Sequence, residues 1–298
     1  MISDQIRNLP GLEIKEDSDL TAFTTMRLAA HGTLIEVLDS QALMSLLPLL
    51  IKDKIPYLLV GWGANQLLPS LVPGVVLHLK MPVQSSMLNE LRPEYDFPAS
   101  TGLNQLTSLA LKYGLKGWEV FTGIPASLGG AIYMNAGTNL GEIGKLIRTV
   151  TLVTPTGEVR IEKIIPQSFS YRKNHFVKPG EVIISATIAH QGTDQNISLK
   201  IREYLEYRKR TQPLTTRNCG CVFKNPHPAI PAGKLIDLLG LKDLQIGDVR
   251  ISSKHANFME NTGMGNWDHF SSLVSIIRYQ MDHWYGIEFE LEVKIPYH

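Results

Sequence analysis

The sequence predicts an α+β protein, because helical and strand-like segments are mixed in it without a strict strand–helix–strand alternation. The chain has 298 residues, enough for two or three domains, and 44% of them are apolar, so a sizeable core can be buried. Three zones differ in texture, and from them we predict domains at residues 1–80, 81–195 and 196–298.

The first zone is predicted to form strand, helix and strand. Short apolar runs of strand length occur at 34–38, 57–61 and 75–79. Between the first two, Ser40 can cap a helix that runs towards Asp53.

The second zone is rich in glycine and in residues that favour strands. A helix is expected from Asn104 to Tyr113, with Gly114 as its C-terminal cap. Strands are expected at 148–154, 158–161 and 182–188, and the turn Pro155-Thr156-Gly157 joins the first two as a hairpin.

The third zone is predicted to be mostly helical until its last residues. Helices are expected at 197–210, 232–239 and 266–285, the last one ending at Gly286. An alternating strand at 287–295 closes the chain, with Glu288, Glu290 and Glu292 on one face.

Charge and hydropathy exclude several classes of protein. Lys and Arg total 29 against 28 for Asp and Glu, which gives no electrostatic case for nucleic acid or a membrane surface. The N-terminal residues lack an apolar signal core, and the apolar run 43–51 is too short to span a bilayer. We expect a cytoplasmic monomer without nucleic-acid or membrane partners.

Cys219 and Cys221 are the two cysteines of the chain. Because they are two positions apart, a disulfide between them would be strained, which suits a reducing compartment. A Cys-x-Cys metal site would need further ligands, and no additional cysteine or His-Glu-x-x-His motif is present, so no metal is expected.

The first glycine-rich loop is GWGAN (61–65), which follows a strand-like run. Glycines after a strand let backbone amides approach phosphate oxygens. A dinucleotide-binding fingerprint would need a third glycine where Gln66 stands and a helix where Pro69 forbids one. The loop is therefore either a phosphate contact or a plain strand-exit turn.

The second loop, GIPASLGGAIYMNAG (123–137), is stronger. It has four glycines, many small residues and no Lys or Arg, so its exposed amides suit a pyrophosphate. A tightly packed Gly/Ala turn in a core is the alternative.

These two loops resemble the flavin-binding segments of the UDP-N-acetylenolpyruvoylglucosamine reductases, where the first loop is usually GGGSN. TTMRLAAHG (24–32) is similar to that family's first motif, with Ala29-Ala30 in place of a glycine pair. The resemblance implies a vanillyl-alcohol-oxidase-like fold, with two FAD-binding subdomains and a C-terminal substrate-binding domain. It implies FAD contacts at Gly61, Trp62, Gly63, Ala64, Asn65, Gly123, Ile124, Pro125, Ser127, Gly129, Gly130, Asn135, Ala136 and Gly137.

FSYRKNHF (169–176) resembles the family's Tyr-Arg motif, which places Arg172 at the reacting centre. Hydride addition to an enolpyruvyl carbon leaves negative charge that a fixed guanidinium stabilises. From the residues alone, a surface arginine is the alternative. Asn174 stands where the family usually has Ser, so a hydroxyl role there is lost.

NCGCVFKNP (218–226) resembles the family's AGSxFKNP motif and places Cys221 on its proton donor, commonly a serine. A thiol, with an ordinary pKa of about 8.5, is a far stronger acid than an alcohol. A small buried hydrophobe is the alternative for a lone cysteine.

The C-terminal segment resembles the family's last motif and assigns Glu292 to the active site beside Arg172, where it helps proton transfer. A solvated acidic face is the alternative. Substrate contacts implied by the resemblance fall on Tyr171, Lys224, Asn225 and Lys242, although a lysine after a helix is also an ordinary surface feature. His255 is expected to be structural.

The spacing of 49 positions from Arg172 to Cys221 leaves no room for the loop whose tyrosine clamps the nucleotide in longer family members. The resemblance therefore implies the short subclass, which reduces UDP-N-acetylenolpyruvoylglucosamine with NADPH through FAD to make a peptidoglycan precursor. Two alternatives remain at this stage: a flavin-dependent oxidase or dehydrogenase of a small alcohol or sugar, and a nucleotide-binding protein that is not an enzyme.

Overall fold

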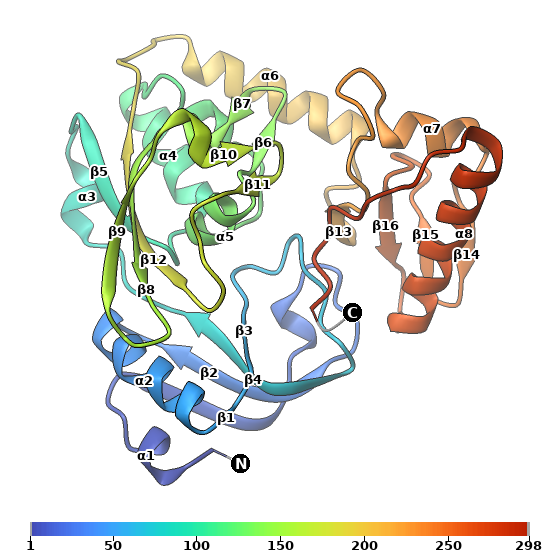
Figure 1. Cartoon of the computed structure of the whole chain (residues 1–298). Helices are drawn as coiled ribbons and strands as arrows, with labels where there is room; N and C mark the ends of the chain where they lie inside the picture. The colour runs from blue at the N-terminus through green and yellow to red at the C-terminus, as the bar shows by residue number, and fades with distance from the viewer. Residues whose placement is uncertain (1, 297–298) are drawn as a thin grey trace. The chain divides into compact units, whose positions relative to one another are not determined.

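A computed structural model describes residues 2–296, and the chain divides into two compact units (Figure 1). The first unit comprises Met1–Glu16, Thr33–Gly61 and Pro73–Leu205. The second comprises Asp17–Gly32, Trp62–Val72 and Glu206–His298. The predicted segment 1–80 contributes residues to both units, and the division into three domains stays a prediction.

The first sheet has the strand order β1-β2-β4-β3, with β3 and β4 parallel. Its strands are β1 (Leu12–Asp19), β2 (His31–Val37), β3 (Tyr57–Leu59) and β4 (Leu71–Leu79). Helix α2 (Ser40–Lys52) follows β2, as predicted, but its N-cap is Asp39, whose carboxylate accepts a hydrogen bond of 2.8 Å from the amide of Ala42. Strand β1 was missed because its charged residues hide the alternation.

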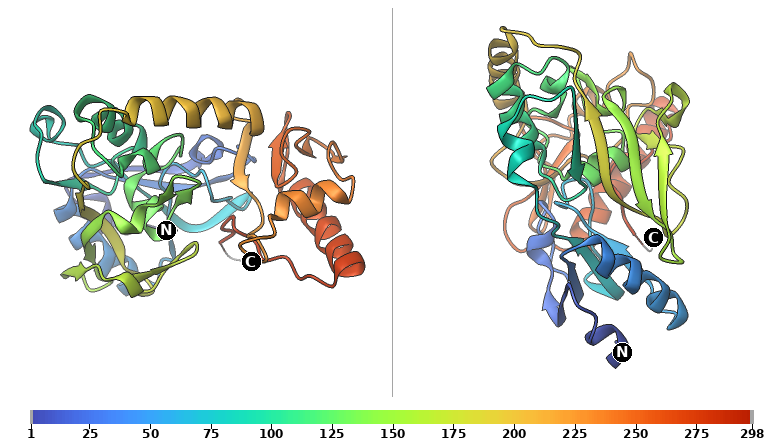
Figure 2. Two further views of the ribbon diagram at one scale, coloured as in Figure 1. Left: turned by 90° about the horizontal axis from the view of Figure 1, so that it is seen from above. Right: turned by 90° about the vertical axis from the view of Figure 1, so that its left-hand side faces the viewer.

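The second sheet belongs to the first unit, is antiparallel throughout and has the order β5-β12-β8-β9. Its strands are β5 (Glu94–Pro98), β8 (Ile147–Val153), β9 (Val159–Lys163) and β12 (Val182–Ala189). Figure 2 shows β8, β9 and β12 running side by side. Here the sequence predictions of the β8–β9 hairpin and of β12 are confirmed, whereas β5 was not predicted.

Shorter elements complete the first unit. Its helices are α1 (Asp4–Arg7), α3 (Ser85–Asn89), α4 (Leu103–Tyr113) and α5 (Leu128–Tyr133). Two small hairpins pair β6 (Gly137–Thr138) with β7 (Gly141–Glu142), and β10 (Phe169–Ser170) with β11 (Lys173–Asn174). One apolar cluster underlies these elements, and Trp118 lies fully buried among Tyr95, Phe97 and Phe121.

The second unit has its own antiparallel sheet, ordered β13-β16-β15-β14, and its own apolar cluster. Its strands are β13 (Arg217–Cys221), β14 (Gln245–Ile246), β15 (Val249–Ile251) and β16 (Phe258–Asn261). Helix α7 (Ala232–Leu238) precedes β14, and α8 (Trp267–Tyr285) packs on β14 and β15 (Figure 1). Helix α6 (Ile197–Thr211), in the segment that leads into this unit, begins where the sequence predicts.

The predicted strand at 287–295 is wrong. The backbone there makes isolated bridges to two different segments, with Leu291 opposite Phe223 and Lys294 opposite Gln66. Because the partner changes after so few residues, no continuous ladder forms. The expected alternation of side chains still holds, since Phe289 and Val293 are buried while Glu288 and Glu290 are exposed.

Candidate active site

The GWGAN loop turns at Gly63, whose φ of +61° is one that side-chain-bearing residues rarely adopt. A Cβ at this position would lie 2.0 Å from the carbonyl oxygen of Phe23, so a side chain cannot be accommodated. The amide of Thr25 donates to the Gly63 carbonyl at 3.1 Å, and the Thr25 hydroxyl donates to the carbonyl of Asn218 at 2.6 Å. The loop is thereby fixed to the segment that leads to Cys221.

Asn65 ties this loop to the C-terminal segment. Its side-chain amide donates to the carbonyl of Glu292 at 3.1 Å, and its own carbonyl accepts from the amide of Lys294 at 2.9 Å. The amide of Leu67 donates in turn to the Lys294 carbonyl at 2.9 Å. Glu292 is therefore held beside the loop that the sequence assigns to the flavin.

The second glycine segment is partly a helix, which the sequence analysis did not predict. Helix α5 is capped by the hydroxyl of Ser127, which accepts from the amide of Gly130 at 3.4 Å. Gly129 packs so closely that a Cβ would lie 2.8 Å from that of Ala99. The amides of Leu128 and Gly129 donate to protein carbonyls, so the predicted run of outward-facing amides is shorter than expected.

Asn135 lies in the same segment, with a φ of +45° and its side chain buried. Its side-chain nitrogen donates to the carboxylate of Glu142 at 3.1 Å and to the carbonyl of Ser170 at 3.0 Å. Its side-chain oxygen accepts from the amide of Gly144 at 3.2 Å. Both donors of the amide are therefore used within the protein, so this side chain has no donor left for a cofactor oxygen.

Arg172 occupies the two-residue turn of the β10–β11 hairpin, after the exposed Tyr171. Its φ of +55° is uncommon for a residue other than glycine. The guanidinium donates to the carbonyl of Gly137 at 2.9 Å and lies over the Tyr171 ring, with Cζ 5.2 Å from the ring centroid. The side chain is half-buried and directed by these contacts, unlike that of an ordinary surface arginine.

Cys221 ends strand β13 after a β-bulge. Between Asn218 and Cys221 the strand advances one residue further than its partner β16, and Gly220 takes a φ of +74°. In a regular strand Cys219 and Cys221 would share a face, but here Cys219 is fully buried and Cys221 is half-buried. Burial raises the pKa of the Cys219 thiol to about 12 and closes it to solvent, whereas Cys221 is partly exposed.

Glu292 lies alongside the residues that come after Cys221. Its amide donates to the carbonyl of Val222 at 2.8 Å, and the amide of Lys224 donates to the carbonyl of Glu290 at 2.8 Å. The structure thus brings Glu292, the residue after Cys221 and residues 62–65 of the GWGAN loop together within the second unit, whereas Gly61 belongs to the first. Arg172 lies in the first unit, with Gly137 and the second glycine segment.

Comparison with known protein families identifies both halves of the chain. Residues 34–161 match the family model "FAD binding domain", and residues 212–296 match "UDP-N-acetylenolpyruvoylglucosamine reductase, C-terminal domain". The reductase of Myxococcus xanthus is 33% identical over 98% of this chain and 95% of its own. That of Chlamydia pneumoniae is 36% identical over 81% and 78%.

A solved structure has the same fold. The reductase of Thermus caldophilus aligns with a TM-score of 0.79 and 29% identity over 95% of this chain and 98% of its own. The chain belongs to the UDP-N-acetylenolpyruvoylglucosamine reductase family. The predicted family, the α+β flavin-binding fold and the class of FAD-containing oxidoreductase are confirmed.

The residues present in this reductase-family chain fit a flavin dinucleotide. Gly123, Pro125 and Gly130 are exposed, and the two glycines present backbone without a side chain. At Gly61 a Cβ would lie 2.4 Å from the Ser127 hydroxyl, so the strand exit and the second glycine segment are in close contact. This bare surface is the kind of support that a large planar cofactor and its pyrophosphate require.

Asn257 is a supporting residue that the sequence analysis missed. Its side chain is buried, accepts from the amide of Phe223 at 2.9 Å and donates to the carbonyl of the same residue at 2.8 Å. Its own carbonyl accepts from the amide of Val222 at 2.9 Å. The residues after Cys221 are therefore fixed by one amide, and nothing in the sequence distinguishes it from a surface asparagine.

Three of the predicted substrate-binding residues, Lys224, Asn225 and Lys242, lie in the second unit and have separate partners. Lys224 forms an ion pair with Glu290, and Lys242 pairs with Asp237 at 2.9 Å. The side-chain oxygen of Asn225 accepts from the amide of Ala232 at 3.0 Å. These contacts orient the side chains without assigning them a ligand.

His255 packs against Phe258, and burial lowers the pKa of its imidazole, so the neutral form is favoured. This agrees with the structural role expected of it. Among residues 2–296, no helix is long and apolar enough to cross a membrane, and no three His, Cys, Asp or Glu side chains gather as a metal site would require.

Proposed function

We propose that this protein reduces UDP-N-acetylenolpyruvoylglucosamine to UDP-N-acetylmuramate with NADPH, by way of FAD, in the synthesis of peptidoglycan precursors. Family membership along nearly the whole chain supports the reaction. The observation that carries the assignment of residues is the fixing of Glu292 to the Cys221–Val222 backbone and to the GWGAN loop.

The two glycine segments would hold FAD, which would supply to the methylene carbon of the enolpyruvyl group a hydride drawn from NADPH. Addition there leaves an electron pair that is delocalised into the neighbouring carboxylate. Arg172 stabilises this negative charge, because a guanidinium fixed by Gly137 needs little reorganisation as charge develops.

Cys221 then gives its proton to the adjacent carbon, which completes the lactyl ether and leaves a thiolate that solvent reprotonates. Glu292 supports this transfer and orients the reacting groups. A thiol suits the step, because it is more acidic than the alcohol it replaces. Arg172, Cys221 and Glu292 are thus the proposed catalytic residues.

The remaining assignments belong to the same proposal. The glycine segments hold FAD, with Asn135 contributing backbone alone. Tyr171, Lys224, Asn225 and Lys242 contact the nucleotide sugar. Lys224 and Lys242 carry positive charge, which suits a diphosphate ligand that takes the place of their acidic partners Glu290 and Asp237. The protein acts as a cytoplasmic monomer of the short subclass, with three functional segments at 1–80, 81–195 and 196–298.

The test separates the two halves of the reaction in Cys221→Ala. The variant keeps FAD and still loses flavin absorbance when NADPH is added, since Cys221 has no part in that step. Recovery of the absorbance on adding the enolpyruvyl substrate anaerobically slows by about 10³-fold or more, because the proton donor is missing. Stopped-flow absorbance at the flavin band measures both steps.

Cys221→Ser is the matched control, and it retains part of the activity because a hydroxyl keeps the geometry of the donor. Full turnover in Cys221→Ala would remove the thiol from the mechanism. Rapid oxygen consumption with a simple alcohol or sugar, without NADPH, would instead identify an oxidase.

A further inference from the structure

The side chain of Asn135 connects three segments of the first unit. It is 1% exposed, and its hydrogen bonds go to Glu142 after the turn of the β6–β7 hairpin, to Gly144 and to Ser170 in β10. Both N–H donors of its side-chain amide are used, and its side-chain oxygen accepts one hydrogen bond. A side chain committed in this way holds backbone segments together.

The segments that Asn135 holds are those that surround Arg172. Ser170 begins the turn that carries Arg172, and its carbonyl is one acceptor of the Asn135 amide. Gly137, two residues after Asn135, supplies the carbonyl that fixes the guanidinium. A Cβ at Gly137 would lie 2.9 Å from Glu142 Cγ and 3.2 Å from Arg172 Nη1, so these two side chains pack over the glycine.

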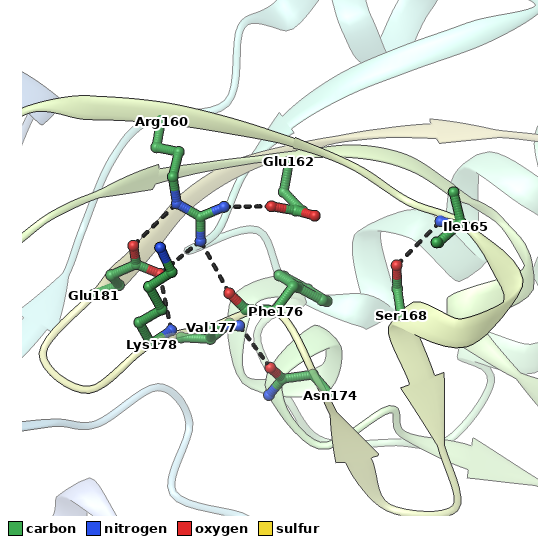
Figure 3. A network of polar contacts seen from close by, with 9 residues as sticks. All are labelled: Arg160, Glu162, Ile165, Ser168, Asn174, Phe176, Val177, Lys178 and Glu181. Carbon is green, nitrogen blue, oxygen red and sulfur yellow. Dashed lines mark hydrogen bonds and ion pairs between the residues drawn. The ribbon is translucent and has the colours of Figure 1, made fainter.

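The chain that leaves the hairpin is held by a different set of contacts. Asn174 donates to the carbonyl of Tyr133 at 2.8 Å and accepts from the amide of Val177 at 2.9 Å. Arg160 donates to the carbonyl of Phe176 at 2.9 Å while paired with Glu181 (Figure 3). Asn135 therefore anchors the strand that enters the turn, and the contacts of Asn174 with Val177 and of Arg160 with Phe176 in Figure 3 hold the chain that leaves it.

We propose that Asn135 is a positioning residue that acts through Arg172, and that it does not hold FAD with its side chain. The inference rests on the proposed function for the role of Arg172, whereas the clamping of the hairpin rests on the hydrogen bonds alone. Loss of the two donors should free the turn and displace the guanidinium from the place where negative charge develops. Such a displacement lowers the rate of the step that Arg172 serves.

Asn135→Asp tests this with the smallest change. Aspartate is tolerated at positive φ, keeps the oxygen that accepts from Gly144, removes both donors and turns the contact with the Glu142 carboxylate from attractive to repulsive. The variant should keep FAD in wild-type amount and be reduced by NADPH at a rate within about 2-fold of wild type. Flavin reoxidation by the enolpyruvyl substrate should slow by about 10- to 100-fold, mainly in the maximal rate and not in the KM.

Hydrogen exchange measured by mass spectrometry gives a second reading that needs no substrate. In FAD-loaded Asn135→Asp, the peptide that covers 169–174 should exchange faster than in the wild type. Asn261→Asp is the matched control, because Asn261 is also buried and donates two hydrogen bonds to carbonyls, at 3.1 and 2.9 Å, but lies in the second unit. It should leave exchange at 169–174 unchanged.

A rescue variant separates positioning from general damage. In Asn135→Asp combined with Glu142→Gln, the new amide can donate to the new carboxylate, which restores one hydrogen bond with its direction reversed. The reoxidation rate should recover part of its loss in the double variant, while the bond to Ser170 stays broken.

Loss of FAD from Asn135→Asp with normal exchange at 169–174 would overturn the proposal, because it would make Asn135 a cofactor ligand. Unchanged reoxidation would overturn it as well. If the wild-type protein itself fails to reoxidise with the substrate, the proposed function falls, and hydrogen exchange still decides the clamp. Faster exchange at 169–174 supports it, and unchanged exchange overturns it.

Discussion

The hairpin that carries Arg172 and the bulge that carries Cys221 both turn a side chain out of regular strand alternation, but different residues take the unusual backbone conformation. In the hairpin, Arg172 itself has a φ of +55°. In the bulge, the preceding Gly220 takes the positive φ, +74°, and Cys221 itself does not have one. The left-handed backbone conformation costs a non-glycine residue about 1–2 kcal/mol, so the hairpin is strained at Arg172, whereas the bulge is not strained at Cys221.

The difference extends to the supports of each region. The hairpin and the chain after it are held by polar contacts, which include the Arg160–Glu181 ion pair, whose carboxylate side chain is buried, and the Asn174 amide, which lies near solvent. The bulge is followed by Val222 and Phe223, which are buried and bonded to Asn257, Val222 through its backbone carbonyl and Phe223 through its neutral side-chain amide. The comparison teaches that ionic and amide contacts can keep the strained Arg172 in place. Cys221 depends instead on Gly220 and on the buried hydrogen bonds of Asn257.

The largest expected effect comes from comparing Asn257 and Asn174, each of which holds backbone groups of other residues through its side-chain amide. Asn257→Ala leaves the buried amide and carbonyl of Phe223 without partners, which should lower the free energy of unfolding by about 2–6 kcal/mol. Asn174→Ala also removes two hydrogen bonds, but the Tyr133 carbonyl it leaves is accessible to water. It should cost about 1 kcal/mol. Urea unfolding of the FAD-loaded variants, followed by circular dichroism, measures both.

Equal losses of unfolding free energy in Asn257→Ala and Asn174→Ala would contradict the contrast between buried and solvent-accessible hydrogen bonds. Asn174→Asp serves as the control for volume, since it keeps the acceptor for Val177 and the size of the side chain.

The next effect depends on pH. The hydrogen bond from Arg160 holds the pKa of the Glu181 carboxyl below its ordinary value of 4.5, against the opposing effect of burial. A lowered pKa in the folded state means that the ionised carboxylate stabilises the fold above the unfolded pKa, and that this stability is lost as pH falls through the folded pKa. Glu181→Gln should therefore be less stable by about 2–3 kcal/mol at pH 7, because a hydrogen-bonded charge is lost.

The difference between wild type and Glu181→Gln should shrink as the pH falls below about 4.5 and vanish once Glu181 is protonated in both states. Denaturant unfolding from pH 7 to pH 3 measures it. Asn257→Ala is the control, since its neutral amide predicts a loss of stability that does not change with pH over this range. A constant difference for Glu181→Gln would show that the charge of the pair is not what holds the chain after the hairpin.

Much of this architecture follows from local sequence signals. Gly114 and Gly286 end their helices with φ of +67° and +60°, as glycine caps should. The β8–β9 hairpin follows from its turn residues. The alternation at 287–295 correctly predicts that Phe289 and Val293 are buried, but not the absence of a strand, because a switch of hydrogen-bond partner leaves no trace in the pattern.

The parts of the candidate site that could not be predicted depend on tertiary contacts. A glycine-rich stretch has low helix propensity, yet α5 forms there because Ser127 caps it and Ala99 packs against Gly129. Asn135 and Asn257 carry no sequence mark of burial, since only the folded chain surrounds each amide with backbone partners. The cysteine pair was visible, but the bulge that separates the two thiols was not.

The smallest effect tests the role of Gly220 against a glycine in the same unit with no bearing on Cys221. Gly220→Ala meets no close atom, since the nearest, the carbonyl oxygen of Ala64, would lie 3.8 Å from the new Cβ. Its cost is therefore that of the left-handed backbone, about 1–2 kcal/mol, and Gly286→Ala, with φ of +60° and nothing within 4 Å, should cost the same. Differential scanning calorimetry of the two FAD-loaded variants measures the loss. Only Gly220→Ala should also slow substrate-dependent flavin reoxidation, because relaxing the bulge would return Cys221 towards the face of Cys219; equal rates in the two variants would show that the thiol does not need the bulge.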